Sequence, residues 1–454
     1  APKSSRASGT AVYLGTKIEL TTESKDAVIY FSTDGSCPCD EDGTRRKYTV
    51  PIIINEDTKI LAMASVGNND DDVSEIVEFN YTLKHADMEF QMEEGWTWIS
   101  HNFENGISAS ALAADEGVSR ILSQTKEVIR DPELGMVGTL NELSAVESYK
   151  VEVTAATSLL RLSDIARNPA TPIGIDAGWN WIGYPIGQTM SVDEAFATTA
   201  AETLDVIVGQ EGFAQFDGEK WVSTLETMSP GMGYMYQSQS AKDIIYNTSI
   251  VSTASAMYAA GISKNLPLVL DIHKYGQIMP VIATISNADG SNLDNEDYQV
   301  AAFCGSECRG IGRVVDGLVM MNVYGNIDDN ITFQVSDTDG ERRFSNTTTL
   351  NFSETVVGDI FNPYSITISN TTDITDVKYS GSIEVEVVNE MLKFKGINTD
   401  DIELVEVYDL NGTRLLRETN VPKSGIRVST LIDGVYIVIV NGNGEYTYHK
   451  IAIR

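Results

Sequence analysis

The sequence predicts a mainly β, multi-domain protein: several β-sandwich modules of Ig-like or jelly-roll type, plus one duplicated small α+β unit. Short segments in which β-branched or aromatic residues alternate with polar ones recur along the chain, and turn residues separate them. The stretch Gly178-Trp179-Asn180-Trp181-Ile182-Gly183 nearly repeats Gly95-Trp96-Thr97-Trp98-Ile99-Ser100, so one module is written twice. A chain of 454 residues is also too long for a single hydrophobic core.

Charge and hydropathy exclude two classes of partner. The formal net charge of −33 argues against binding to nucleic acid or to an anionic membrane surface. No run of about 18 apolar residues occurs, so we expect no membrane insertion. The first residues lack the apolar segment of a signal peptide. The chain could therefore be a mature product or the tail of a longer precursor, and both alternatives stay open.

Residues 8–83 have the spacing of a small β-sandwich, with alternating segments at 17–21, 27–32, 50–54 and 59–64. The strand and turn Ile29-Tyr30-Phe31-Ser32-Thr33-Asp34-Gly35-Ser36 are followed by Pro51-Ile52 and by Lys59-Ile60-Leu61-Ala62-Met63-Ala64. Together they resemble the chitobiase-type C-terminal sandwich module. The resemblance implies an accessory domain of secreted and surface proteins that carries no chemistry of its own.

Residues 88–250 contain the doubled module, with copy one at about 92–165 and copy two at about 175–250. The copies align beyond the tryptophans, because Val137-Gly138-Thr139-Leu140 matches Val222-Ser223-Thr224-Leu225 and Tyr149 matches Tyr234. Each copy has a helix-prone middle. Two copies are too few for a solenoid. They could pack together as one pseudo-symmetric unit or stand as two small domains.

Residues 251–370 lack tryptophan and contain Asp-Gly turns at 289–290, 316–317 and 339–340 between strand patterns, which predicts a β-sandwich of jelly-roll or Greek-key type. The motifs Ala302-Phe303, Glu307-Cys308-Arg309-Gly310, Phe333-Gln334-Val335 and Val357-Gly358-Asp359 resemble a module of secreted proteins of Bacteroidetes bacteria. The resemblance covers this segment only.

Residues 372–454 predict a final Ig-like sandwich. Val405-Glu406-Val407-Tyr408-Asp409-Leu410-Asn411-Gly412 is a strand that enters an Asn-Gly hairpin turn. With Leu431-Ile432-Asp433-Gly434-Val435-Tyr436 and the closing Lys450-Ile451 it resembles the C-terminal sorting domain of type IX secretion substrates. The usual Asn-Pro opening motif of that domain is absent, and Val388-Asn389-Glu390 stands in its place. The resemblance implies export to the cell surface.

The four cysteines form two close pairs, Cys37 with Cys39 and Cys304 with Cys308. No histidine lies beside either pair, so we expect disulfides within the pairs rather than zinc binding. Two free thiols at Cys37 and Cys39 remain an alternative, because a ring this small is strained. Disulfides would imply an oxidising compartment.

We assign no catalytic residues. Nucleophilic catalysis needs a base in reach of the nucleophile, and the four histidines, His85, His101, His273 and His449, occur in no recognisable signature. Acidic residues are so abundant that pairs of carboxylates carry no information. No cofactor is required by any motif. Calcium is the one metal that the sequence leaves open, at an acidic loop whose oxygen ligands would be Asp289, Asn292, Asp294 and Asp297.

The aromatic residues are the remaining candidates for ligand contact. Trp96 with Trp98, and Trp179 with Trp181, lie two residues apart and should share one face of a strand, where they could form a sugar platform. Their repetition favours a core role. Trp221 aligns with Met136, so the module does not require an indole there. We therefore expect Trp221 to be exposed, with Phe216 beside it at the Gln215-Phe216-Asp217-Gly218 turn.

The sequence thus favours a secreted or cell-surface, non-catalytic protein for adhesion or ligand binding, or the accessory tail of a larger precursor. Its partner would be a host or cell-surface glycan or protein. One alternative is a secreted hydrolase of glycans or peptides whose site lies between modules. A second alternative is a structural surface or fibre component.

Overall fold

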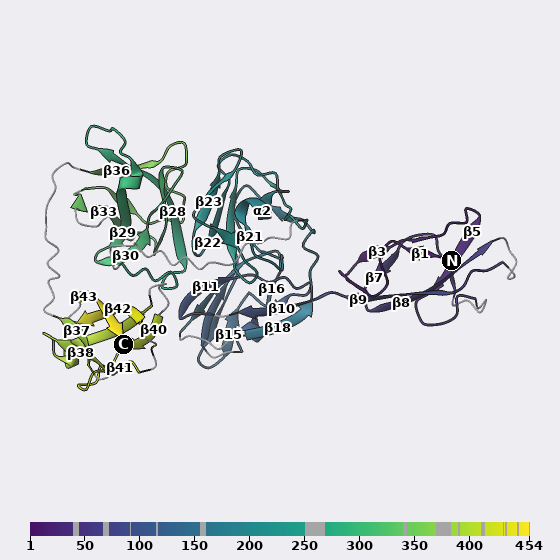
Figure 1. The fold of residues 1–454 in the computed structure, drawn as a ribbon, viewed down its shortest axis with the longest axis horizontal. Helices are drawn as coiled ribbons and strands as arrows, with labels where there is room; N and C mark the ends of the chain where they lie inside the picture. Colours follow the sequence, from purple (N-terminus) through teal and green to yellow (C-terminus); the bar gives the residue numbers. More distant parts are fainter. Residues whose placement is uncertain are drawn as a thin grey trace. The chain divides into compact units, whose positions relative to one another are not determined.

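The computed structural model confirms a mainly β, multi-domain architecture of β-sandwich modules (Figure 1). It describes the whole chain except residues 40–44, 67–71, 91, 115–116, 155–159, 250–267, 339–342, 345, 369–382, 389–390, 410–413, 430, 432–433, 443–444 and 454. Contacts within the chain define two compact units, Ala1–Ala200 with Met228–Ala254, and Ala201–Thr227 with Ser255–Arg454. No helix among the described residues is long and apolar enough to cross a membrane.

The first unit begins with a small sandwich whose main sheet has the order β2-β9-β8-β5-β6, with the pairs β3-β7 and β1-β4 beside it. Alternating aliphatic and polar residues place one face of each strand in a shared core that includes Ile18, Ile54 and Ile60. The strands are β1 (Lys3–Ser4), β2 (Thr10–Val12), β3 (Thr16–Ile18), β4 (Leu20–Thr21), β5 (Ala27–Ser32), β6 (Arg46–Lys47), β7 (Ile52–Ile54), β8 (Thr58–Val66) and β9 (Val77–Leu83).

Copy one of the doubled module is a five-stranded sheet in the order β11-β17-β13-β14-β15, with the pairs β10-β18 and β12-β16 beside it. Its helix-prone middle forms only one turn, α1. Its elements are β10 (His85–Phe90), β11 (Gly95–Ile99), β12 (Ile107–Ser108), α1 (Ala109–Leu112), β13 (Val118–Leu122), β14 (Glu127–Asp131), β15 (Gly135–Gly138), β16 (Glu142–Leu143), β17 (Tyr149–Val153) and β18 (Leu160–Ile165).

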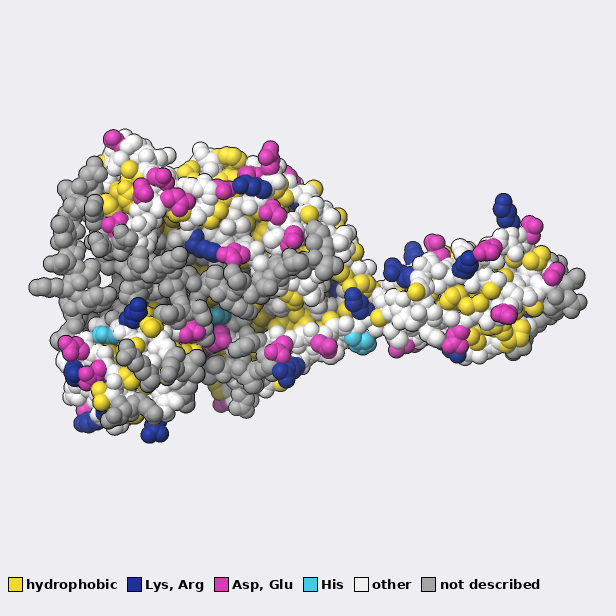
Figure 2. Space-filling model, in the orientation of Figure 1, with side chains coloured by type: hydrophobic (Ala, Val, Ile, Leu, Met, Phe, Trp, Pro, Cys, Tyr) yellow, Lys and Arg dark blue, Asp and Glu magenta, His cyan; other side chains and the backbone are white. Residues whose placement is uncertain are grey.

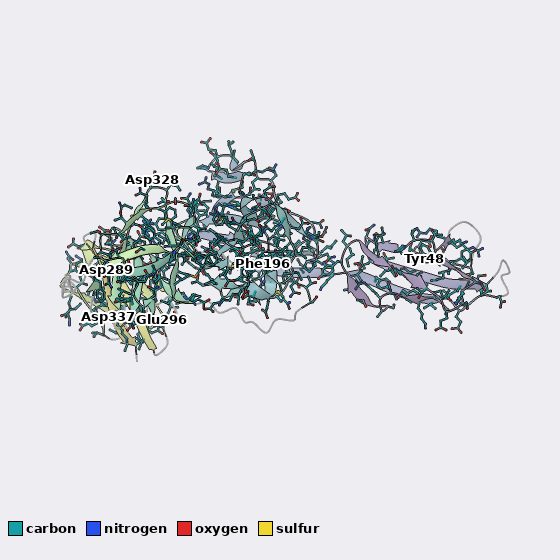
Figure 3. All side chains as sticks on the ribbon, turned by 90° about the horizontal axis from the view of Figure 1, so that it is seen from above. Tyr48, Phe196, Asp289, Glu296, Asp328 and Asp337 are labelled. Atoms are coloured by element: carbon teal, nitrogen blue, oxygen red, sulfur yellow. A yellow bond between two sulfur atoms is a disulfide. The ribbon has the colours of Figure 1, made fainter. Side chains whose placement is uncertain are left out.

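Copy two repeats the same elements. In the first unit, β20 pairs with β26 as β11 pairs with β17, and the capping box of Ser191 and Glu194 starts α2. Phe196 at the end of α2, labelled in Figure 3, packs on Tyr236 and Tyr246. These elements are β19 (Ile173–Ile175), β20 (Gly178–Ile182), β21 (Met190–Ser191), α2 (Val192–Phe196), β26 (Tyr234–Ser238) and β27 (Lys242–Ile244).

In the second unit, β22, β23 and β24 form an antiparallel meander, as β13, β14 and β15 do in copy one. A turn in which Asp217 accepts two backbone N–H groups joins β23 to β24, and Asp131 makes the same turn between β14 and β15. The meander is thus the counterpart of the copy-one meander. Its strands are β22 (Val206–Gly209), β23 (Phe213–Phe216) and β24 (Trp221–Ser223), and β25 (Thr227–Met228) follows.

The rest of the second unit holds two further sandwiches. The first has sheets β31-β32-β28-β36 and β30-β29-β33-β34, with β35 paired to β33, and its core contains Val281, Val323 and Phe333. Its elements are β28 (Gln277–Asn287), η1 (Asn295–Asp297), β29 (Tyr298–Cys304), β30 (Glu307–Ile311), β31 (Arg313–Val315), β32 (Leu318–Gly325), β33 (Asn330–Asp337), β34 (Arg343–Phe344), β35 (Thr349–Asn351) and β36 (Tyr364–Ile368).

The C-terminal sandwich has sheets β37-β38-β41 and β40-β39-β42-β43 around a core that includes Leu392, Val405 and Val438. The expected hairpin after Tyr408 joins β39 to β40, and its Asn-Gly turn lies outside the described residues. The elements are β37 (Glu384–Val388), β38 (Met391–Lys395), η2 (Thr399–Asp401), β39 (Ile402–Tyr408), β40 (Arg414–Glu418), β41 (Ile426–Arg427), β42 (Gly434–Gly442) and β43 (Glu445–Ile453).

Candidate functional site

Copy one and the first-unit part of copy two contact each other through two equivalent sets of backbone contacts. Ile99 at the end of β11 forms a β-bridge with Met232, and Ile182 at the end of β20 forms one with Glu147. The hydrogen bond from Gly233 N to Trp98 O has its counterpart in the bond from Ser148 N to Trp181 O. The two Gly-Trp-x-Trp-Ile strands therefore meet about an approximate two-fold axis.

A buried lysine lies between the tryptophans at this axis. The Lys150 Nζ atom is 4.5 Å from the ring centroid of Trp98 and 4.6 Å from that of Trp181. Both Lys150 and Trp98 are buried, whereas Trp96, Trp179 and Trp181 are half-buried. A cation held against two indoles stabilises the contact between the copies. Trp98 and Trp181 thus have a structural role here.

Gln124 at the tip of the β13-β14 hairpin also joins the copies. Its Nε2 atom donates to Trp179 O at 2.8 Å, and its Oε1 atom accepts from Trp181 N at 2.9 Å. These two bonds engage the carbonyl of Trp179 and the N–H of Trp181, which flank Asn180 in β20. The main-chain groups of the second Trp-x-Trp strand are therefore used in the fold.

The expected exposure of Trp221 is wrong, since its side chain is only 6% exposed. The ring packs against Phe216, its cross-strand neighbour, with 5.3 Å between centroids. The aligned residue Met136 packs against the core of copy one, so both positions face inward. The turn beside Trp221 is also structural, because the Asp217 carboxylate accepts from Glu219 N and Lys220 N. The apolar residue Met136 at the aligned position of copy one was the indication that Trp221 lies in the core.

The structure points instead to the outer face of the copy-one sheet, which we define as the face that carries Trp96 and Trp98. A row of directly opposed residues crosses this face, one from each strand: Trp96, Glu152, Arg120, Ile129 and Val137. Arg120 donates from Nε to Glu127 Oε2 at 3.0 Å. Ile129 and Val137 are 46% and 43% exposed, and Leu134 in the following turn is more exposed still.

The equivalent face of the copy-two meander is covered. Gln215 and Val222, which oppose each other there, are 3% and 5% exposed. The first sandwich of the second unit supplies the donors that cover it: Asn322 Nδ2 to Gly209 O at 3.1 Å, Tyr324 OH to Gln210 O at 2.6 Å and Arg313 Nη1 to Thr224 O at 3.0 Å. The backbone N–H of Ile360 donates to Gln215 Oε1 at 2.9 Å. This face is therefore a docking surface for a β-sandwich.

The two faces differ in their residues: Arg120 and Glu127 of copy one stand where copy two has Val206 and Phe213, whereas two other positions are aliphatic in copy one and polar in copy two. The turns and hairpins align so that Ile129 of copy one corresponds to Gln215 of copy two, and Leu134 corresponds to Lys220. Lys220 is salt-bridged to Asp316 at 2.6 Å, within the same docked surface. Contiguous exposed aliphatic residues on a soluble protein mark an interaction site. The copy-one hairpin thus carries exposed aliphatic side chains that are suited to an interface.

The two cysteine pairs behave differently. Cys37 and Cys39 form the expected disulfide. The expected Cys304–Cys308 disulfide is wrong, and both thiols are free. The register of β29 and β30 pairs Cys304 with Glu307 and Cys308 with Phe303, so the two sulfur atoms point to opposite faces of the hairpin. Burial raises the pKa of Cys308 to about 12.

The acidic loop of the first sandwich uses its oxygen atoms within its own turns. Asp289, labelled with Glu296 in Figure 3, accepts from the N–H and hydroxyl of Ser291. Asp294 caps the turn η1 by accepting from Glu296 N at 3.1 Å. Among the described residues, no three His, Cys, Asp or Glu side chains are placed to hold a metal ion. The structure does not bring the four calcium candidates, including Asn292 and Asp297, together as a site.

The buried histidine of copy one is part of its core. The His101 Nε2 atom lies 2.8 Å from Leu143 O, and its Nδ1 atom accepts from Phe103 N at 3.3 Å. This arrangement fixes the neutral tautomer that carries its proton on Nε2. Burial lowers the pKa of His101 below the usual range of histidine.

Comparisons with known proteins match one module. The model of the chitobiase/beta-hexosaminidase C-terminal domain matches residues 7–77, which confirms the resemblance of the N-terminal sandwich. No curated protein matches the sequence. Among solved structures, Tp47, the 47-kilodalton lipoprotein of Treponema pallidum, is 8% identical over 80% of this chain and 100% of its own, with a TM-score of 0.16.

Two further solved structures, each a fragment of four domains, also match. The first four Ig domains of Dscam1 isoform 6.44 are 8% identical over 100% of this chain and 98% of their own, with a TM-score of 0.12. The D1–D4 ectodomain fragment of ICAM-5 is 10% identical over the same shares, with a TM-score of 0.13. TM-scores this low support no conclusion about fold or function.

Proposed function

We propose that this chain is a secreted or cell-surface, non-catalytic protein for adhesion or ligand binding, and that it binds through the outer face of the copy-one sheet. The observation that carries the proposal is the contrast between the copies. The β14-β15 end of this face is open in copy one, where Ile129, Leu134 and Val137 are exposed, and the corresponding face of the copy-two meander is covered by a β-sandwich. An open face of this composition is suited to a macromolecular partner.

The shape of the open face favours binding over catalysis. Ile129, Val137 and Arg120 lie on one face of the sheet, and the Arg120 guanidinium is paired with Glu127. A catalytic site would instead require a concave pocket with a nucleophile or acid-base pair. The rival proposal of a hydrolase would be favoured if the pure protein cleaved oligosaccharides or peptides.

For a glycan ligand we propose a groove in the first unit. A groove of about 450 Å³ is lined by Tyr13, Lys84, Asn168, Gln188 and Thr248, among others. Amide and hydroxyl side chains beside an aromatic ring are the groups that bind saccharide hydroxyls and faces. The adjacent N-terminal module matches a domain named after glycan-degrading enzymes. Glycan binding at this groove is the second candidate function.

Binding of the labelled full-length chain to intact cells and to a glycan array tests both candidates. The double substitution Ile129→Lys with Val137→Lys should abolish cell binding, because it places two charged side chains on the proposed apolar contact face. Ile327→Lys is the matched control, since Ile327 is 51% exposed and belongs to the second unit. Cell binding that survives the double substitution would reject the face.

Loss of array binding in Thr248→Arg, which fills the groove, would support the glycan site instead. Array binding that is unchanged in this variant would reject the groove. The chain would be a structural component rather than a binding protein if it bound neither cells nor glycans.

A further inference from the structure

We propose that the open face of copy one is the docking site for the N-terminal β-sandwich of a second copy of this chain, so that copies join head to tail. The inference rests on the proposed function, since it names the partner of the same face. It follows from three features of the first unit: the chemistry of the face, the exposed patch on the N-terminal module, and the short connection between them.

The copy-two interface shows which chemistry the face can accept. There the meander offers backbone carbonyls, at Gly209, Gln210 and Thr224, and a carboxylate, at Glu226, which pairs with Arg313. The docked sandwich supplies the donors. The partner of the open face should therefore be a β-sandwich that presents cationic or other donor side chains beside aliphatic ones.

Copy one offers corresponding acceptors. Ser123 and Lys126 close its hairpin as Gly209 and Gly212 do in copy two, and Thr139 bonds to the preceding strand as Thr224 does. By this alignment the carbonyls of Ser123, Gln124 and Thr139 correspond to the three carbonyls that receive donors in copy two, and the Gln124 side chain at the hairpin tip contacts β20. Around Leu134, the acidic side chains of Asp131 and Glu133 add negative charge.

The N-terminal sandwich carries a complementary patch. Val50 and Ile53 are 68% and 52% exposed, and the exposed Lys17 is the cross-strand neighbour of Ile53. The exposed cations Arg46 and Lys47 lie a few residues earlier in the chain, on the edge strand β6 of the main sheet, and the Arg46 guanidinium donates to Thr33 Oγ1. Figure 2 shows hydrophobic and basic side chains side by side on this module. The combination of aliphatic and donor groups is the one that the open face requires.

In this arrangement a chain does not place the patch of its N-terminal sandwich on its own copy-one face. Strand β9 ends at Leu83 and β10 begins at His85, so a single residue, Lys84, joins the two modules. Its N–H donates to Val12 O and its carbonyl accepts from Ala166 N. The connection is thus one residue that is hydrogen-bonded on both sides, and the patch and the face are exposed in the same unit. A second copy must supply the patch, and a contact between two different surfaces is open-ended.

The net charge of −33 opposes this association at long range. Salt near 0.15 M, where the Debye length is about 8 Å, screens the repulsion and leaves short-range apolar contacts in place. Association should therefore strengthen as salt is raised from about 0.01 M to 0.15 M. A contact held only by ion pairs would weaken over the same range.

Sedimentation velocity of the full-length chain tests the proposal. We expect the mean mass to rise with concentration past that of a dimer, and to return to the monomer value in a face variant (Ile129→Lys with Val137→Lys) and in a patch variant (Val50→Lys with Ile53→Lys). The control Ile327→Lys should associate like the natural chain. A natural chain that is monomeric at every concentration in 0.15 M salt would overturn the proposal.

Mixing the two variants makes the test specific. The face variant still carries an intact patch and the patch variant still carries an intact face, so an equimolar mixture should form a dimer and stop there. Failure of the mixture to dimerise would also overturn the proposal, provided that both variants show the natural far-ultraviolet circular dichroism. Cell binding that is lost in the face variant while every chain stays monomeric would leave the proposed function standing and reject this partner.

Discussion

The two copies of the Gly-Trp-x-Trp-Ile module share strands, turns and tryptophans, yet the outer faces of their meanders have opposite environments. Gln215 and Val222 of copy two are covered by the first sandwich, whereas Ile129 and Val137 of copy one are open. The comparison separates what the module needs in order to fold from what one copy has gained. The repeated residues are framework, and the residues that differ between copies are candidates for function.

The sharpest test of this contrast is the same substitution at the two aligned valines. Val222→Lys places an unpaired charge in a buried interface and should destabilise the protein by about 3–5 kcal/mol. Val137→Lys adds a charge to a solvent-exposed strand and should change the free energy of unfolding by no more than about 0.5 kcal/mol. Urea denaturation of both variants measures the difference. Equal effects would show that the two faces have the same environment.

The axis between the copies should respond to Lys150, because copy two has Met235 at the aligned position. Lys150→Met keeps the apolar stem and removes the ammonium group from both indoles, so we expect a loss of about 1–2 kcal/mol. Denaturation followed by tryptophan fluorescence reports this loss where it arises. A variant as stable as the natural chain would show that burial of the charge offsets both cation–π contacts.

The copies should also differ in their response to pH, since His101 of copy one aligns with Tyr184 of copy two. Burial lowers the pKa of His101, so the unfolded chain binds a proton that the native chain does not. The stability that depends on this neutral ring is present above about pH 6.5 and is lost as the pH falls below it, by up to about 1.4 kcal/mol per unit of pKa shift.

Unfolding midpoints of the natural chain and of His101→Gln at pH 7.5 and 5.5 measure this contribution. Carboxylates titrate in both chains, so the difference between the two pH dependences isolates the histidine. We expect the smaller pH dependence in His101→Gln. Identical pH dependence in both chains would contradict the neutral buried ring.

The smallest expected effect concerns the two faces of the β29-β30 hairpin. Cys308 is buried with a pKa raised to about 12, whereas Cys304 is partly exposed. A thiol reagent at pH 8 should therefore modify Cys304 first in the native protein, with Cys308 reacting only after unfolding. Mass spectrometry of the labelled peptides follows both. Equal rates, or a disulfide between the two residues, would contradict the assigned register.

The fold class and the duplication could be predicted because period-two patterns and repeated tryptophans are local features of the sequence. The covering of one face could not, since Ile129 and Gln215 occupy alternating strand positions whether or not another domain lies on them. Only long-range contacts such as Tyr324 to Gln210 reveal it. Trp221 was misplaced because Met136 at the aligned position shows only that the module needs no indole there, whereas an apolar counterpart indicates a buried position. Cys304 and Cys308 were misplaced because spacing does not disclose strand register.

Carbene footprinting of the dilute full-length chain tests the central claim most directly, because it reports the solvent exposure of both meanders in one experiment. The account predicts strong labelling of Ile129, Leu134 and Val137 and little labelling of Gln215 and Val222, with the copy-one labelling falling as the chain associates at higher concentration. Equal labelling of the two meanders would contradict the account.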